Sequence, residues 1–129
     1  MKRTLFLLKP DFFEKELWQE FLDVLKTHNL VVECDFYVTL ATLDDVKDLY
    51  QWETLWNIEM MIQYWCQQPH RVLVVKARNA VQKAHQVKKF FRSKYCNECH
   101  VMYTLIHCPD TFKDFQREIN FLMGKKLVQ

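Results

Sequence analysis

Glycine is almost absent from this chain: its 129 residues include only one. Phosphate-binding loops of the P-loop and dinucleotide-binding kinds need several positive-φ residues close together, which glycine normally supplies. Such loops are therefore excluded, and any phosphate group must be bound by side chains and helix ends. Long apolar runs are absent as well, so the sequence contains no candidate membrane-spanning segment.

Acidic residues are missing from one long stretch, between Glu59 and Glu98. The same stretch contains many basic residues: Arg71, Lys76, Arg78, Lys83, Lys88, Lys89, Arg92 and Lys94. The net charge of the chain is only +2, which does not by itself indicate a protein that binds nucleic acid or membranes. Clustering of one sign favours an anionic partner, and a solvated helix face is the alternative interpretation.

The N-terminal Met-Lys-Arg-Thr leads directly into an apolar run with no cleavage region, so we expect no secretory leader. The five cysteines are expected to be reduced thiols, as in a cytoplasmic protein. Half of the residues are hydrophobic, and the sequence contains no repeat, linker or low-complexity tract. Residues 1–129 are therefore predicted to form a single domain with its own core.

Short apolar runs alternate with amphipathic segments along the chain. Thr4–Leu8 and Arg71–Lys76 are predicted to be central strands buried on both faces, with Val32–Thr39 and Val101–Ile106 as the outer strands. Helices are expected from Asp11 to Leu25, across Asp44–Gln67, along the Ala80, Ala84, Val87 and Phe91 stripe, and from Phe112 to Leu122. This order predicts an α+β ferredoxin-like sandwich, with helices covering a four-stranded antiparallel sheet.

Two of these helices have candidate cap residues at their starts. Asp11 is followed three residues later by Glu14, a pattern that predicts a capping box for the first helix. Asp110 is the predicted N-cap of the last helix.

His107 is the most informative single residue, because it ends an apolar run just before a helix start. Glu118 lies in that following helix and is placed to accept a proton from one ring nitrogen, which would leave the other nitrogen as a nucleophile. Lys9 closes the first apolar run in the same way. A histidine and a lysine at the ends of two strands can converge on one phosphate group. A structural histidine and an exposed glutamate are the alternatives.

The basic stretch contains a second candidate group, formed by His85, Lys88 and Arg92. Their spacing of i, i+3 and i+7 places them on one helix face, where three donors could bind phosphate oxygens and Arg92 could bind bidentately. An ordinary exposed basic face has the same spacing.

A cysteine cluster offers two further interpretations. Cys96, Cys99 and His100 have the form of a c-type haem attachment site, which the missing export signal argues against. Cys96, Cys99 and Cys108 with one histidine have a spacing that permits tetrahedral zinc. A metal-bound His107 could not attack phosphorus, and chance clustering is the simplest interpretation, so no metal ligand is assigned.

Five segments taken in order resemble the nucleoside diphosphate kinase family, from Arg3 to about Met123. They are the first strand ending in Lys9, the Asp-Leu-Tyr50 segment, Phe-Arg92-Ser-Lys-Tyr, Leu-Ile-His107-Cys-Pro-Asp and Arg-Glu118-Ile. The Arg92 segment is similar to that of the shorter, divergent members. The resemblance implies that His107 is the phosphorylated residue, that Glu118 supports it, and that Lys9, Tyr50 and Arg92 contact the nucleotide. Lys88 is a further candidate contact because of its spacing on the basic helix.

The sequence departs from the family pattern at several of these positions. Thr104 stands where the family has an asparagine, His85 aligns near its first phosphate arginine, and Cys108 and Pro109 replace a glycine and a serine. Thr104 and His85 remain candidate nucleotide contacts, and Trp56 is the only stand-in for the residue that stacks on the base. Each lost charge-assisted contact could weaken binding by about 1–3 kcal/mol.

The resemblance therefore implies a divergent nucleoside diphosphate kinase-like domain with weakened activity. It would transfer the γ-phosphate of a nucleoside triphosphate, carried with Mg²⁺, to a nucleoside diphosphate through phospho-His107. The alternative is an inactive domain that acts as a structural or protein-binding part, for example in a ciliary or microtubule-associated assembly. A cytoplasmic location is expected, with cilium or cytoskeleton for the alternative. The sequence is compatible with a homo-oligomer, whereas membrane and nucleic-acid partners are not expected.

Overall fold

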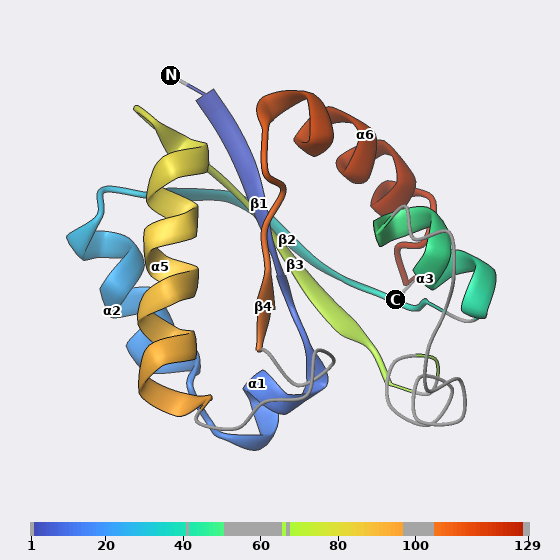
Figure 1. Cartoon of the computed structure of the whole chain (residues 1–129), viewed down its shortest axis with the longest axis horizontal. Coiled ribbons are helices and arrows are strands. Elements are labelled where there is room, and N and C mark those ends of the chain that lie inside the picture. Colours follow the sequence, from blue (N-terminus) through green and yellow to red (C-terminus); the bar gives the residue numbers. More distant parts are fainter. Residues whose placement is uncertain (1, 41, 51–65, 67, 97–104, 128–129) are drawn as a thin grey trace.

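A computed structural model describes residues 2–40, 42–50, 66, 68–96 and 105–127. The elements in chain order are β1 (Lys2–Leu8), α1 (Pro10–Glu14), α2 (Trp18–Thr27), β2 (Val31–Val38), α3 (Leu43–Tyr50), β3 (His70–Ala77), α5 (Ala80–Tyr95), β4 (Ile106–His107) and α6 (Phe112–Met123). Figure 1 shows the strands running between two groups of helices, with α2 and α5 on one side and α3 and α6 on the other.

The four strands form one antiparallel sheet in the order β2-β3-β1-β4. The expectation that the first and third strands are central is confirmed, and so is the ferredoxin-like arrangement. Residues 4–8 of β1 are all buried, as the wholly apolar run predicted. In the register, Leu7 of β1 pairs with His107 of β4 and with Val72 of β3. The sheet therefore fixes the position of His107 relative to the end of β1.

Each face of the sheet has its own hydrophobic core, because side chains alternate along a strand. Phe6 and Leu8 face α1, α2 and α5, where Phe12, Phe21 and Phe91 join them. Leu5, Leu7 and Val72 face the other way and pack with α3 and α6. Burying each such side chain contributes about 1.5–3 kcal/mol, so the two cores hold the helices firmly against the strands.

The first helical segment differs from the prediction, because α1 and α2 are separate helices. Glu16 between them has a φ of 55°, and a left-handed residue cannot continue a right-handed helix. The predicted capping box is wrong: Lys9 occupies the N-cap position of α1, Pro10 follows it, and Asp11 lies within the helix. The Asp11 carboxylate instead accepts the backbone N–H of Leu105, at 3.0 Å.

The start of α6 is also shifted by one residue from the prediction. Thr111, not Asp110, is the N-cap, and its hydroxyl accepts the backbone N–H of Asp114 at 3.0 Å. Thr111 has extended backbone angles, which point its hydroxyl at the first turn of the helix.

Two other predicted elements are described only in part. The fourth strand was expected to end at Ile106, but the described β4 includes His107 itself. The rest of that run, residues 101–104, lies outside the described residues. The predicted helical segment Asp44–Gln67 is represented by α3, and most of its remainder also lies outside the described residues.

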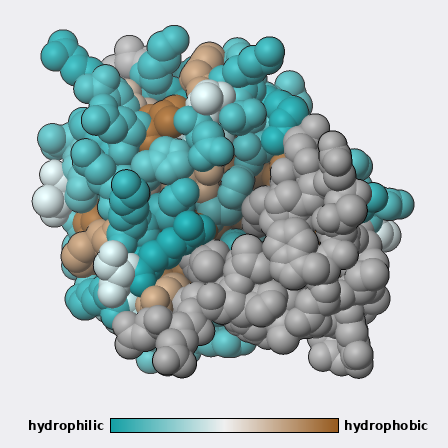
Figure 2. All heavy atoms as spheres, viewed as in Figure 1, coloured by the Kyte–Doolittle hydropathy of each residue, from teal (hydrophilic) through white to brown (hydrophobic). Residues whose placement is uncertain are grey.

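The four residues predicted to form an apolar stripe on the basic helix, Ala80, Ala84, Val87 and Phe91, are all buried in α5. Figure 2 shows mainly hydrophilic residues over the side of the molecule that carries α2 and α5. Part of the basic charge is neutralised there, since Lys94 lies 2.5 Å from Glu20 of α2. Within the described part of the chain, no helix is long and apolar enough to cross a membrane.

Candidate functional site

His107 and Glu118 form a hydrogen-bonded pair between β4 and α6. The His107 Nε2 atom lies 2.5 Å from Glu118 Oε1, so the expected contact is confirmed. Glu118 is placed there because it belongs to the buried stripe of α6, together with Phe115 and Leu122. Its side chain is only 3% exposed, and a buried carboxylate needs a hydrogen-bonded partner. The local sequence of α6 thus holds the carboxylate against the ring.

The pair defines the chemical state of the imidazole. A neutral ring that donates its Nε2–H to Glu118 carries its lone pair on Nδ1. Burial lowers the pKa of His107, while Glu118 acts in the opposite direction and the charges of Lys9 and Lys88 lower the pKa further. The net result is a pKa below the ordinary range. His107 is therefore neutral near pH 7, the form of histidine that can act as a nucleophile.

Lys9 lies beside this pair, directly after β1. It is two residues beyond Leu7, the partner of His107, so its side chain emerges on the same face of the sheet as the histidine. Lys9 is only 3% exposed. Burial and the nearby charge of Arg92 lower its pKa to about 7, although Asp11 opposes the shift. A bound anion would favour the charged form of this lysine.

The backbone just before His107 is strained and held on several sides. Leu105 has a φ of 66°, an uncommon value for a bulky residue. Its N–H is bound by the Asp11 carboxylate, and its carbonyl accepts the Lys9 N–H at 2.9 Å. Arg92 Nη2 donates to the next carbonyl, that of Ile106, at 2.7 Å. Strained positions persist only where surrounding contacts determine them, and they cluster at functional sites.

Arg92 and Lys88 approach the site from α5, which packs on the opposite face of the sheet. Hydrogen bonding alternates along an antiparallel strand, so the Ile106 carbonyl points away from β1 at the free edge of β4. Arg92 binds it there, and its charge acts on Lys9. Lys88 is half-buried, and burial lowers its pKa. The two cations therefore lie around the edge of β4, within electrostatic reach of Lys9 and His107.

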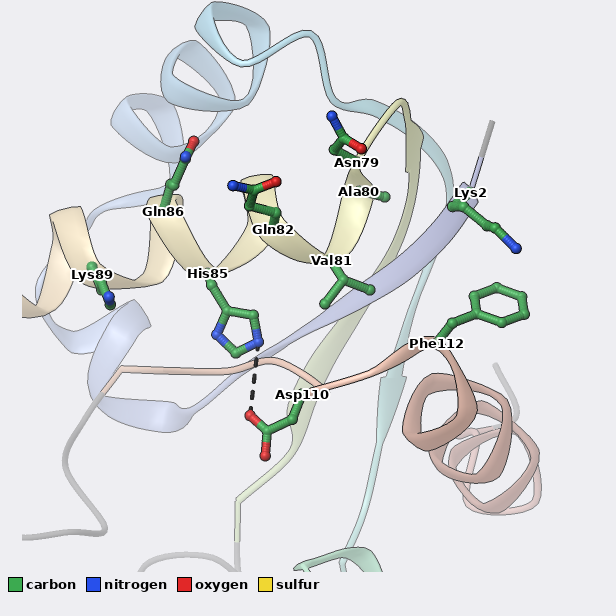
Figure 3. Close-up of a pocket in the computed structure, with 10 residues that line it drawn as sticks. All are labelled: Lys2, Asn79, Ala80, Val81, Gln82, His85, Gln86, Lys89, Asp110 and Phe112. Carbon is green, nitrogen blue, oxygen red and sulfur yellow. Dashed lines mark ion pairs between the residues drawn. The ribbon is translucent and has the colours of Figure 1, made fainter.

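His85, the third member of the predicted basic face, faces a different place. Its Nε2 lies 3.0 Å from the Pro109 carbonyl oxygen and 3.8 Å from an Asp110 carboxylate oxygen. Figure 3 shows the ring pointing toward Asp110 in a pocket between the first turns of α5 and the start of α6. The pocket has a volume of about 620 Å³, and neither Lys9 nor His107 is among the residues that line it. The role of His85 as a nucleotide contact stays a prediction.

The remaining predicted residues are described only in part. Tyr50 is the last residue of α3, whereas Thr104, Cys99 and Trp56 lie outside the described residues. Within the described ranges, no three His, Cys, Asp or Glu side chains are grouped so that they could hold a metal. Burial raises the pKa of the Cys108 thiol to about 12. This thiol is therefore protonated near pH 7 and cannot compete with His107 as a nucleophile.

His70 is a buried polar residue of this region that sequence reasoning did not select. It is the first residue of β3 and is fully buried, and no hydrogen bond joins either ring nitrogen to another described residue. Burial and then the charge of Lys9 lower its pKa to about 3, against a smaller opposing effect of the Gln68 backbone. A histidine that begins an apolar strand gives no sequence signal of such a position, because imidazoles occur in cores, on surfaces and in sites alike.

Three solved structures of nucleoside diphosphate kinases are similar to this chain over nearly its whole length. The structure from Encephalitozoon cuniculi has a TM-score of 0.79 at 16% identity and covers 100% of this chain and 95% of that chain. The structure from Halobacterium salinarum, in complex with CDP, has a TM-score of 0.76 at 17% identity, with coverages of 99% and 92%. The structure from Aquifex aeolicus has a TM-score of 0.72 at 17% identity and covers 98% of this chain and 99% of that chain.

Comparison of the sequence gives no further assignment. No protein-family model matches it, and no curated protein matches it. The likeness is therefore one of structure, carried by the sheet order and the packing of helices on both faces. The chain has the fold of the nucleoside diphosphate kinases.

Proposed function

We propose that this chain is a divergent phosphotransferase of the nucleoside diphosphate kinase type, in which His107 carries the phosphoryl group. In the first half-reaction, His107 Nδ1 forms a bond to the γ-phosphorus of a nucleoside triphosphate while the bond to the β-phosphate oxygen breaks. A nucleoside diphosphate leaves, and a second one takes the group in the reverse of this step. The observation that carries the proposal is the His107–Glu118 pair, whose 2.5 Å hydrogen bond uses Nε2 and directs the lone pair to Nδ1.

The surrounding groups supply positioning and charge, which dominate catalysis of phosphoryl transfer. Glu118 orients the ring, and Lys9 gains its full charge when phosphate oxygens arrive. Arg92 and Lys88 offset charge on the transferring group from the edge of β4. Mg²⁺ enters with the substrate, bound to its phosphates. A similar structure from Halobacterium salinarum holds CDP, which supports a nucleotide as the ligand of this fold.

The other nucleotide contacts of the proposal come from the family resemblance and from helix spacing. Tyr50 and Thr104 are assigned nucleotide contacts by resemblance to the family, and Tyr50 ends the helix that packs beside α6. His85 is hydrogen-bonded to Pro109, and its nucleotide contact stays part of the proposal. With fewer contacts on the phosphates, we expect activity lowered by orders of magnitude, because each 1.4 kcal/mol is a factor of about ten.

A second candidate function is a protein-binding module that has lost the chemistry. The observation in its favour is α5, which contains no acidic residue and has Lys89 exposed. Such a face fits an acidic partner surface, and partners in ciliary or cytoskeletal assemblies belong to this alternative. It requires that His107 take up no phosphate.

Transfer of labelled phosphate from γ-labelled ATP to GDP distinguishes the two functions. We expect transfer by the wild type and none by His107→Ala. His28→Ala is the matched control, because His28 caps the end of α2 and hydrogen-bonds the Val24 carbonyl; it should transfer at the wild-type rate. A wild type that transfers no label, or a His107→Ala variant that transfers it normally, would overturn the proposal.

A further inference from the structure

Arg117 is the residue next to Glu118 on α6, and sequence reasoning gave it no role. Consecutive residues of a helix point about 100° apart. Glu118 faces the sheet and is buried, while Arg117 reaches sideways and is 37% exposed. Its Nη2 lies 3.7 Å from Glu118 Oε2, the oxygen opposite the one that binds His107. The carboxylate is thus flanked by an imidazole on one side and a guanidinium on the other.

The guanidinium is held in this place by the end of α3. Arg117 Nη1 donates to the carbonyl of Asp48 at 3.1 Å, and Nη2 donates to the carbonyl of Leu49 at 3.2 Å. The last four carbonyls of a helix have no partner within it, and a cation there is favoured by the helix dipole. Figure 1 shows α3 lying beside α6. Two donors on two adjacent carbonyls hold the positive charge beside the Glu118 carboxylate.

We propose that Arg117 is a positioning residue for His107: held by the end of α3, it shares the charge of the Glu118 carboxylate and keeps the imidazole in its neutral, nucleophilic form. A carboxylate bonded only to the histidine would hold a proton on the ring more strongly. An imidazolium has no lone pair and cannot attack phosphorus. This inference deepens the proposed function, but its direct readout needs no phosphate transfer.

Other charged groups face His107 as well and have to be kept constant. Glu118 approaches from α6, Lys9 from the end of β1 and Lys88 from α5. A change at Arg117 leaves all three in place. It alters only the charge on the far side of the carboxylate and the contact with α3.

The test is a titration of the His107 ring by NMR in the whole, nucleotide-free chain, with the signal assigned through His107→Gln. Arg117→Gln removes the charge, and we expect the pKa of His107 to rise by roughly half a unit to one unit. Arg117→Lys keeps the charge and should leave the pKa near the wild-type value. Arg3→Gln is the control, since Arg3 pairs with Glu33 on β2, away from the site; it should produce no shift.

The outcomes separate a positioning role from a purely structural one. If Arg117→Gln lowers Tm but leaves the pKa of His107 unchanged, Arg117 only fastens two helices and the proposal is wrong. An equal shift in Arg3→Gln would also overturn it. If Arg117→Gln does not fold, Arg117→Lys decides, because a changed pKa with the charge retained contradicts the proposal. Failure of the wild type to transfer phosphate would overturn the proposed function and leave this result standing.

Discussion

At the scale of single residues, burial makes several basic groups around His107 harder to charge. Burial lowers the pKa values of Lys9, His70 and His107 together. Each positive charge makes the next one harder to form, because all three lie near one another in a poorly solvated place. A phosphate group would reverse this effect for Lys9. The cost of holding these groups neutral falls on the stability of the ligand-free protein.

Among these groups, His70 has a strongly lowered pKa, and this predicts how the stability of the fold depends on pH. Its pKa is about 3 in the folded chain, against 6.5 when unfolded. The unfolded chain therefore binds more protons below pH 6.5, and stability is fully present above that value and lost as pH falls toward 3. Between pH 7 and 5 we expect His70 to account for a loss of about 2 kcal/mol.

The substitution His70→Leu tests this expectation by urea denaturation at both pH values. The variant should lose about 2 kcal/mol less than the wild type between pH 7 and 5, because leucine cannot take up a proton. At pH 7 it should be at least as stable, since the structure shows no hydrogen bond from His70 to another described residue that the substitution would remove. Equal pH dependence in the two proteins would show that His70 is not the group responsible.

At the scale of elements, the five-residue helix α1 makes a buried contact that links it to the segment before β4. Asp11 is buried in it and joins α1 to the backbone just before β4, across 94 positions of sequence. The same segment includes Leu105, whose positive φ is maintained by contacts from Asp11, Lys9 and their neighbours. Without these contacts, the backbone could relax and His107 would move relative to Glu118.

We therefore expect Asp11→Ala to destabilise the fold by about 1.5–3 kcal/mol, the range for a buried hydrogen bond to a charged group. Thermal or urea denaturation measures this directly. Asp23→Ala is the matched control, because Asp23 is exposed on α2 and its carboxylate accepts a surface hydrogen bond from Gln19; its effect should stay within about 0.5 kcal/mol. If both variants lost similar free energy of unfolding, the buried contact of Asp11 would not be a major source of stability.

The elements also show where sequence reasoning succeeds. Thr4–Leu8 and Arg71–Lys76 were recognisable as central strands because both faces of a central strand are buried, and no polar residue occurs within 5–8 or 72–75. The stripe of α5 and the Glu118 position followed from helical spacing. The first helix and its cap failed, because Asp11 satisfies a capping pattern locally while its partner is distant in sequence. A local pattern cannot reveal a tertiary contact that competes with it.

At the scale of the whole molecule, the fold brings three chain segments to one end of the sheet. The end of β1 supplies Lys9, β4 supplies His107 and α6 supplies Glu118. Their convergence was predictable from strand ends and from the family resemblance. The contacts of Arg117 with the end of α3 and of His85 with Pro109 were not, because both depend on how α3, α5 and α6 pack against one another. Packing of this kind has no signature in single-residue spacing.

The central claim, that His107 is a nucleophile acting through Nδ1, is tested most directly by locating the phosphate. Wild-type protein incubated with ATP and Mg²⁺ is kept at alkaline pH, where phosphohistidine survives, and the modified ring nitrogen is identified by NMR. We predict phosphate on Nδ1 of His107, because Glu118 occupies Nε2. Phosphate on Nε2, on another residue, or on no residue at all would contradict the account.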